Sequence, residues 1–146
     1  MALQTFKSKI IERKDLTDEL IILSFSTPES FSFKAGQYVQ LKIERKSEIK
    51  WKSFSILNPP KIKGHIDMYI KLINGGFASD VFKDAKEGDE FEIKGPLGLF
   101  TFNEKDDNEV FFICVGTGLA PIHSMLLENV ERYKKINFYL IFGSKT

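Results

Sequence analysis

The 146-residue chain has a single cysteine and almost no excess of charge of either sign. One thiol, Cys114, cannot form an internal disulfide or the four-cysteine set of a zinc or two-iron, two-sulfur site, so a reducing compartment is expected. There are 21 Lys and Arg residues against 20 Asp and Glu residues, which leaves a net charge of +1. This balance provides no strong field for nucleic acid or an anionic membrane, so any anion must be bound locally.

Long apolar runs are missing as well. Residues 1–14 lack the apolar stretch of about 7–15 residues that defines a signal peptide. No later run approaches the roughly 20 residues of a membrane span. The sequence therefore predicts a cytoplasmic protein with no membrane span and no nucleic-acid partner. Phenylalanine, by contrast, is abundant, with 14 copies in a chain long enough for one domain and part of another.

Residues 5–95 show the pattern of an antiparallel β-barrel. Short apolar or alternating runs are separated by polar and glycine-containing segments, as is typical of small barrels. The polar segment 14–18 predicts a hairpin turn between the first two strands. A short helix is expected over 77–84, directly after Gly75 and Gly76. The predicted strands cover residues 6–13, 19–26, 37–43, 53–57, 65–73 and 89–94.

The last third of the chain has the pattern of an α/β unit. Residues 110–115 are continuously apolar, which suits a strand covered on both faces. Apolar residues at helical spacing predict a helix over 120–133, and a second apolar strand is expected over 136–142. A single βαβ unit of about 37 residues is too small to fold alone. We therefore expect a barrel domain over 1–103 and a partial α/β domain over 104–146.

The segment Lys52-Ser53-Phe54-Ser55 lies on a predicted strand and has two interpretations. Strand alternation sends Lys52 and Phe54 to one face and the two serines to the other. The segment is then either an ordinary strand with an exposed lysine and a core phenylalanine, or a binding element for a planar, phosphorylated ligand. In the second interpretation the cation neutralises phosphate, the ring stacks and a hydroxyl bonds a ring nitrogen.

Two glycine-containing turns are further candidates for phosphate binding. Residues 74–79 (NGGFAS) lead from a strand into a short helix. They form either a tight turn followed by an N-cap, or a site where main-chain N–H groups and a serine hydroxyl hold phosphate. Residues 116–121 (GTGLAP) lie between an apolar strand and a helix, which is the context that a phosphate-binding βα turn requires.

In this order and spacing, these segments resemble the motifs of the ferredoxin–NADP reductase superfamily. Residues 52–55 resemble its Arg-x-Tyr-Ser/Thr flavin motif, and the glycine turn ending at Ser79 resembles its flavin-pyrophosphate motif. The segment 95–100 (GPLGLF) is similar to the one that closes the flavin barrel, and 116–121 is similar to the turn that opens the pyridine-nucleotide domain. The resemblance implies an antiparallel Greek-key β-barrel of the FAD-binding, ferredoxin reductase type, followed by a partial α/β nucleotide-binding unit.

The resemblance also implies a set of cofactor-binding residues. Lys52 would meet flavin phosphate, Phe54 would pack on the isoalloxazine and Ser55 would bond near its reactive nitrogen. Ile70 and Lys71 would pass the phosphate or adenosine side. Lysine here replaces the family's arginine and phenylalanine its tyrosine. The full implied set is Lys52, Ser53, Phe54, Ser55, Ile70, Lys71, Gly76, Ala78, Ser79, Gly116, Thr117, Gly118 and Pro121, with no catalytic acid–base residue and no metal ligand.

The function that the resemblance implies is that of a flavin-dependent oxidoreductase, incomplete as an isolated chain. FAD, with FMN as the alternative, would accept a hydride from NADH or NADPH and pass electrons to an iron–sulfur protein, haem or another acceptor. Two rival hypotheses remain open: a non-catalytic flavin-binding or electron-transfer subunit that needs another chain for its nucleotide lobe, and a small barrel without a cofactor. The partial α/β unit would expose apolar strands, so a homodimer or a covering partner is expected.

Overall fold

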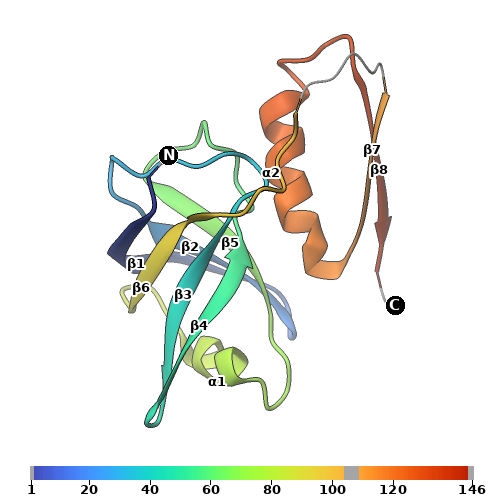
Figure 1. The fold of residues 1–146 in the computed structure, drawn as a ribbon. Helices are drawn as coiled ribbons and strands as arrows, with labels where there is room; N and C mark the ends of the chain where they lie inside the picture. Colours follow the sequence, from blue (N-terminus) through green and yellow to red (C-terminus); the bar gives the residue numbers. More distant parts are fainter. Residues whose placement is uncertain (1, 104–108, 145–146) are drawn as a thin grey trace.

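A computed structural model describes residues 2–103 and 109–144 of the chain. Six antiparallel strands form one sheet, which curls into an open barrel with the strand order β4-β3-β6-β1-β2-β5 (Figure 1). The predicted antiparallel barrel is therefore confirmed. The strands are β1 (Gln4–Thr17), β2 (Leu20–Ser26), β3 (Tyr38–Arg45), β4 (Glu48–Ser55), β5 (His65–Lys71) and β6 (Glu90–Leu97).

Side chains that alternate along the strands fill the inside of the barrel. In β3, Val39, Leu41 and Ile43 are completely buried, whereas the residues between them are half-buried. This period of two is the pattern from which the strand was predicted. The rings of Phe82 and Phe91 pack in the same core with 5.7 Å between their centroids. Several of the abundant phenylalanines thus serve to fill the barrel.

The first two hairpins differ from the sequence prediction. The predicted turn over 14–18 is wrong, because β1 continues to Thr17 and pairs with β2 up to a two-residue turn at 18–19. The polar residues of β1 are tolerated there because this part of the strand is exposed. β4 starts at Glu48, well before the predicted start at residue 53, and pairs with β3 along its whole length. An edge strand can carry such charged side chains, which also protect its open edge.

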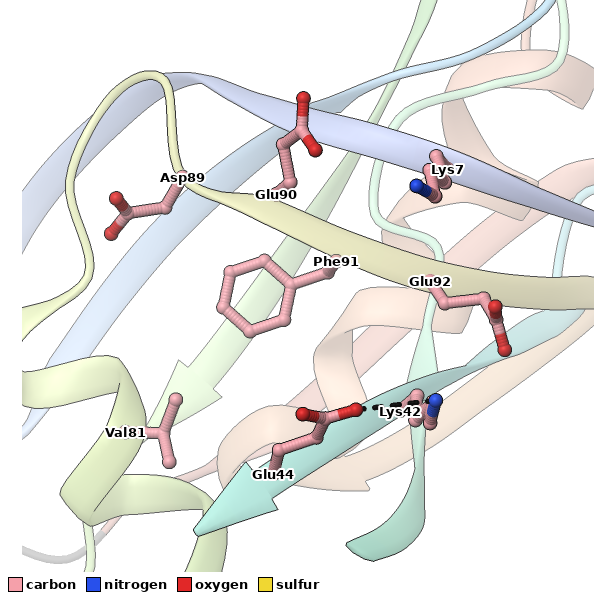
Figure 2. A pocket seen from close by; sticks show the side chains of 8 residues that line it. All are labelled: Lys7, Lys42, Glu44, Val81, Asp89, Glu90, Phe91 and Glu92. Atoms are coloured by element: carbon pink, nitrogen blue, oxygen red, sulfur yellow. Dashed lines mark ion pairs between the residues drawn. The ribbon is translucent and has the colours of Figure 1, made fainter. Parts of the chain in front are cut away.

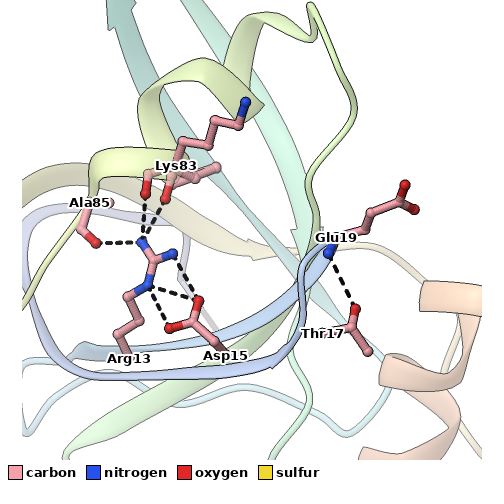
Figure 3. Close-up of polar contacts among 7 residues, drawn as sticks. Arg13, Asp15, Thr17, Glu19, Lys83 and Ala85 are labelled. Carbon is pink, nitrogen blue, oxygen red and sulfur yellow. Dashed lines mark hydrogen bonds and ion pairs between the residues drawn. The ribbon is translucent and has the colours of Figure 1, made fainter.

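Helix α1 (Phe77–Asp84) lies across one end of the barrel, over the residues predicted for it (Figure 1). Arg13 of β1 holds its C-terminal end, donating hydrogen bonds to the carbonyl oxygens of Phe82 at 2.8 Å and Ala85 at 2.6 Å (Figure 3). Positive charge at a helix C-terminus also interacts favourably with the helix dipole. Asp15 accepts a hydrogen bond from the same guanidinium at 2.9 Å, and this bond holds the pKa of Asp15 below its usual value.

The second unit consists of two parallel strands and a helix, as predicted. β7 (Glu109–Val115) leads through a short 3₁₀ helix, η1 (Gly116–Gly118), into α2 (Leu119–Asn129). β8 (Asn137–Gly143) then pairs in parallel with β7. α2 lies between the barrel and the β7–β8 pair (Figure 1). The helix ends at Asn129, earlier than the predicted residue 133. The N–H groups of Arg132 and Tyr133 then donate hydrogen bonds to the Asn129 carbonyl oxygen.

The second unit packs on the barrel through a small core. Its buried members are Phe112, Ile122 and Met125, and Ala35 of the barrel completes the cluster. The predicted domain boundary after residue 103 falls at a segment that lies outside the described residues. Within the ranges 2–103 and 109–144, no helix is long and apolar enough to cross a membrane.

Candidate functional site

The barrel is open along one side, where the edge strands β4 and β5 approach each other. The two strands are in contact, but the sheet has no ladder of main-chain hydrogen bonds between them among the described residues. Main-chain N–H and C=O groups along these edges are therefore available for other partners. α1 follows β5 and contacts β4, and η1 contacts β5. This β4–β5 seam brings together the three segments that carry the predicted site residues.

The register of β4 places two predicted site residues and one further lysine on its inner face. Lys50, Lys52 and Phe54 stand opposite the three fully buried residues of β3. Directly opposite residues of an antiparallel pair project to the same side of the sheet. Ser53 and Ser55 project to the other face, as strand alternation predicted. β4 therefore offers two ammonium groups and one aromatic ring on a single face.

Contacts with α1 hold this row of side chains. The ring of Phe54 is half-buried and packs edge to face against Phe82, with 5.5 Å between the ring centroids. The ammonium of Lys50 lies 4.4 Å from the ring centroid of Phe77, the first residue of α1. The inner face of β4 therefore lies against α1, and its Lys50 end is beside the helix N-terminus.

Carboxylates balance part of the positive charge in this region. Glu48 pairs with Lys50 at 2.9 Å, and this hydrogen bond lowers the pKa of Glu48. Arg45 of β3 pairs with Asp80 in the first turn of α1. No carboxylate within the described part of the chain pairs with Lys52. Lys52 is half-buried, and its ammonium is the group best placed to attract an anionic ligand.

A tight glycine turn precedes α1. Gly75 has a φ of +71°, a conformation that L side chains rarely adopt. A Cβ on Gly76 would lie 2.9 Å from both the carbonyl oxygen of Ile73 and the Oγ of Ser79, so only glycine fits. Ser79 is buried, and its Oγ accepts a hydrogen bond from the Ile73 N–H at 2.8 Å. Gly76 and Ser79 thus shape the tight turn that the structural interpretation predicted, but the side-chain N-cap expected with it is not found among the described residues.

The N-terminus of α1 remains suited to an anion. No side chain caps it among the residues that the structure describes. The first-turn N–H groups, at Phe77 and Ala78, have no intrahelical acceptor and carry the positive end of the helix dipole. Lys50 adds positive charge beside them, which Glu48 and the first-turn Asp80 offset in part. Such a helix end can bind a phosphate or pyrophosphate group.

The glycine turn after β7 is an open surface beside β5. Gly116 has a φ of +54°, and no atom lies within 4 Å of the position that its Cβ would occupy. Thr117 and Gly118 are exposed as well. Pro121 is buried in the first turn of α2, where a missing N–H costs no hydrogen bond. Gly116, Thr117 and Gly118 can therefore meet a ligand directly, whereas the Pro121 side chain packs against protein.

The two predicted residues of β5 differ in what they offer. Ile70 is 2% exposed and its side chain lies in the barrel core, on the same face as Ile66 and Met68. Lys71 is exposed. Because β5 is an edge strand, Ile70 can offer its main-chain groups to a ligand in the seam, although its side chain cannot reach it. Lys71 can offer both its main chain and its ammonium.

A separate hollow of about 470 Å³ lies between β3, β6 and α1 (Figure 2). Figure 2 shows the ring of Phe91 in its middle, with Lys42 and Glu44 paired at 3.2 Å on one side. None of the predicted site residues lines it. Neither here nor elsewhere in the described ranges do three or more His, Cys, Asp or Glu side chains gather as metal ligands. The candidate site is therefore the β4–β5 seam.

The residues of the seam fit a flavin nucleotide. Phe54 supplies a ring face fixed from behind by Phe82. Lys52, Lys50 and the uncapped end of α1 supply positive charge and N–H donors for phosphate. A planar ring system joined to a pyrophosphate needs both kinds of surface on one side of the protein, and β4 with α1 provides them.

Comparison with known proteins identifies the family. Residues 7–102 match the family model of the oxidoreductase FAD-binding domain. The chain belongs to this FAD-binding family. The matched range includes the β4 motif, the glycine turn before α1 and almost all of the barrel.

Two solved structures contain the fold of this FAD-binding domain within longer chains. A cytochrome P450 reductase of Amycolatopsis superposes with a TM-score of 0.88 at 26% identity, covering 99% of this chain and 44% of that one. A ferredoxin NADP+ reductase from Neisseria gonorrhoeae, with bound FAD and NADP, has a TM-score of 0.83 at 27% identity, covering 94% and 56%. Both likenesses extend through the second unit, which confirms the predicted barrel followed by a partial α/β unit.

The chain matches part of a longer curated relative. The phenol hydroxylase P5 protein of Acinetobacter pittii (strain PHEA-2) is 30% identical over 143 residues, which is 97% of this chain and 40% of that protein. The chain thus spans less than half of that relative. The resemblance to the ferredoxin–NADP reductase superfamily is confirmed by the family model and by the reductase structures.

The sequence analysis missed two basic residues of this FAD-binding domain. Lys50 and Arg45 were assigned no role from the sequence. The structure places both beside Phe77, at the N-terminus of α1. Alternation from Lys52 back to Lys50 would have revealed the second lysine, had the strand been predicted to start at Glu48.

Proposed function

We propose that this chain binds FAD along the β4–β5 seam and forms the flavin part of an oxidoreductase. In this proposal the enzyme takes a hydride from NADH or NADPH and passes electrons to a protein or small-molecule acceptor. The observation that carries it is the inner face of β4, where Lys52 and Phe54 stand in one row with Lys50 beside the uncapped N-terminus of α1.

Lys52 and the first turn of α1 hold the phosphates. The Lys52 ammonium is a mobile point charge, so it neutralises phosphate without the fixed two-pronged geometry of an arginine. The N–H groups of Phe77 and Ala78 add directional hydrogen bonds at the helix end. Gly75 and Gly76 allow the chain to turn sharply enough to present them.

Phe54 and Ser55 orient the ring system. Phe54 is held edge to face by Phe82 and presents its remaining surface for stacking. Ser55 is the last residue of β4 and is half-buried, and we assign its hydroxyl to the polar edge of the isoalloxazine. Ser53 projects to the same face as Ser55, but it is exposed within the strand, whereas Ser55 is half-buried where the strand ends, so Ser53 contributes least.

FAD, when bound, supplies the redox chemistry by accepting a hydride and releasing electrons. The protein then needs to bind and orient rather than to provide an acid–base pair. Gly116, Thr117 and Gly118 offer exposed main-chain groups beside β5 to the dinucleotide. Lys71 and the edge main chain of Ile70 face the phosphate or adenosine side of the flavin.

The electron acceptor is proposed by analogy with the relatives. Their names refer to phenol hydroxylase, a cytochrome P450 and ferredoxin. We therefore propose an iron–sulfur or haem protein, or an oxygenase component, as the acceptor. The cytoplasm is the proposed compartment, since the lone Cys114 is kept as a thiol there.

A non-catalytic flavin-binding or electron-transfer subunit is the second candidate. One observation favours it: the outer face of the β7–β8 pair exposes apolar side chains, among them Ile113 at 71% and Val115 at 73%. Exposed apolar strands of this kind favour a second copy or a partner chain that covers them. Such a partner would supply the rest of the nucleotide lobe.

Two measurements test these functions in turn. Titration of the protein into FAD, followed by quenching of flavin fluorescence, should show saturable binding. Uptake of neither FAD nor FMN would refute the proposal. Oxidation of NADH or NADPH by the FAD-loaded protein with an artificial acceptor then separates the reductase from the non-catalytic subunit, which should give no turnover unless its partner is added.

A further inference from the structure

Two adjacent hydrogen bonds connect helix α2 to the barrel. His123 Nδ1 donates to the carbonyl oxygen of Leu57 at 3.0 Å, and Ser124 Oγ donates to the carbonyl oxygen of Asn58 at 2.8 Å. A carbonyl can only accept, so the first contact requires the hydrogen of the ring to be on Nδ1. Ser124 is completely buried, so loss of its acceptor would leave a desolvated hydroxyl. We call these four residues the α2 junction.

The two accepting carbonyls belong to the segment that follows the flavin motif. This segment is fixed to β5 as well: the Leu57 N–H donates to the carbonyl oxygen of Asp67 at 2.8 Å. The Asn58 side chain donates to the carbonyl oxygen of His65 at 3.1 Å and accepts from the Asp67 N–H at 2.8 Å. One buried segment therefore connects the end of β4, the start of β5 and α2.

The other contacts between α2 and the barrel have little directional character. Ala35 packs on the cluster around Met125, and apolar contact alone does not set the rotation of a helix. Just beyond the end of α2, Glu131 lies 3.8 Å from Lys61, and both are exposed, so their ion pair contributes little. Hydrogen bonds weaken steeply when they bend, and two from neighbouring helix positions restrain both the rotation and the tilt of α2.

We propose that His123 and Ser124 are positioning residues that fix the place of the Gly116–Gly118 turn relative to the flavin motif. The turn directly precedes α2. The carbonyls that accept hydrogen bonds from α2 belong to Leu57 and Asn58, which follow Ser55 closely in the chain. The catalytic consequence rests on the proposed function, because flavin and dinucleotide must meet in a defined geometry. A displacement of about 1 Å can lower the rate of such a step by about 100-fold.

Residual dipolar couplings of backbone amides test the orientation in the full chain without any ligand. In the parent protein, the couplings of the barrel strands and of α2 should fit one alignment tensor. The double variant His123→Leu/Ser124→Ala should require two alignment tensors. The tensor of α2 should have the smaller magnitude, because the helix then moves relative to the barrel. His123→Asn keeps an N–H donor near the position of Nδ1 and should still give one tensor.

Asn129→Ala is the matched control. Asn129 is buried on the same helix, but it donates to the Met125 carbonyl within α2, at 2.7 Å, rather than to the barrel. Its loss should weaken the helix and keep a single tensor. If Asn129→Ala also gives two tensors, general loosening of α2 explains the effect and the proposal is overturned.

A second measurement follows reduction of bound FAD by NADH and NADPH in stopped flow. The double variant should have a limiting rate about 10–100-fold lower than the parent, whereas the dissociation constant of FAD stays within about twofold. His123→Asn should recover most of the rate. A structural role alone would lower FAD affinity and rate together in all variants.

The possible results separate the two claims. A single tensor in the double variant overturns the positioning role. If the parent takes up no FAD or is reduced by neither nucleotide, the proposed function fails, and the tensor comparison alone decides the positioning role. If the double variant is unfolded, judged by its amide spectrum, Ser124→Ala takes its place under the same criterion.

Discussion

The barrel and the βαβ unit differ in how completely each buries its own apolar surface. Among the described residues, the barrel core contains sixteen buried hydrophobic residues, which come from every barrel strand except β4, from α1 and from the loops between them. The βαβ core contains four, and one of these, Ala35, belongs to the barrel. The barrel therefore provides its own stability, whereas the smaller unit depends on its contact with the barrel.

This difference separates the two halves of the candidate site. Lys52 and Phe54 stand on a strand whose partner, β3, lies deep in the large core. Gly116, Thr117 and Gly118 precede a helix that is oriented by the α2 junction. Flavin-side geometry should thus be robust, and dinucleotide-side geometry should be sensitive to small changes.

The largest expected effect distinguishes the two cores directly. Phe82→Ala removes a fully buried ring that packs against Phe54 and Phe91, and should lower the free energy of unfolding by about 3–5 kcal/mol. Phe112→Ala in β7, where the core is small and open, should lower the free energy of unfolding by less. Urea unfolding measures both. Equal losses would show that the βαβ unit is as well packed as the barrel.

Gly36→Ala should affect the contact between the two units. Its φ is +97°, and a Cβ would lie 2.1 Å from the Phe100 carbonyl oxygen and 3.2 Å from Met125 Sδ. Backbone strain and the displacement of the Phe100 carbonyl together should lower the free energy of unfolding by roughly 2–4 kcal/mol. Gly64→Ala is the control, since Gly64 has a similar φ of +88° with no atom within 4 Å. Thermal unfolding that shifts equally for both variants would contradict the role of the close contact.

Lys52→Ala should weaken FAD binding by about 1.5–3 kcal/mol, because a charge-assisted contact with phosphate is lost. Ser53→Ala, one residue along on the opposite face of β4, is the matched control and should change little. Fluorescence titration gives both dissociation constants. Equal affinities would mean that the flavin does not meet the inner face of β4.

The smallest effect concerns the exposed strands of the βαβ unit. Tyr139 donates a hydrogen bond to Glu109 at 3.2 Å, and this bond, with the charge of the carboxylate, raises the pKa of Tyr139. Folding then favours the protonated phenol, so the small contribution to stability is present below the unfolded pKa and disappears as pH rises through the folded one. Glu109→Gln should lower the Tyr139 pKa, measured by NMR titration of the tyrosine rings. An unchanged pKa would exclude the contact.

Local patterns predicted the elements whose burial is one-sided or complete. β3 alternates because one of its faces fills the core, and α1 follows its glycine turn as expected. The start of β4 and the end of β1 escaped prediction because those stretches are exposed, so neither shows apolar alternation. Ile70 was assigned to the cofactor through the resemblance, although its spacing from Ile66 and Met68 indicates the core face.

The sequence by itself determined the barrel, the βαβ unit and the side of β4 on which Lys52 and Phe54 stand, because strand alternation and glycine turns act over a few residues. The tertiary structure alone decided that Lys50 lies beside the start of α1, and that Ser124 reaches the Asn58 carbonyl 66 residues away. Contacts between segments so far apart depend on how the sheet curls and where α2 packs. No local pattern encodes such contacts, since each partner alone resembles an ordinary polar residue.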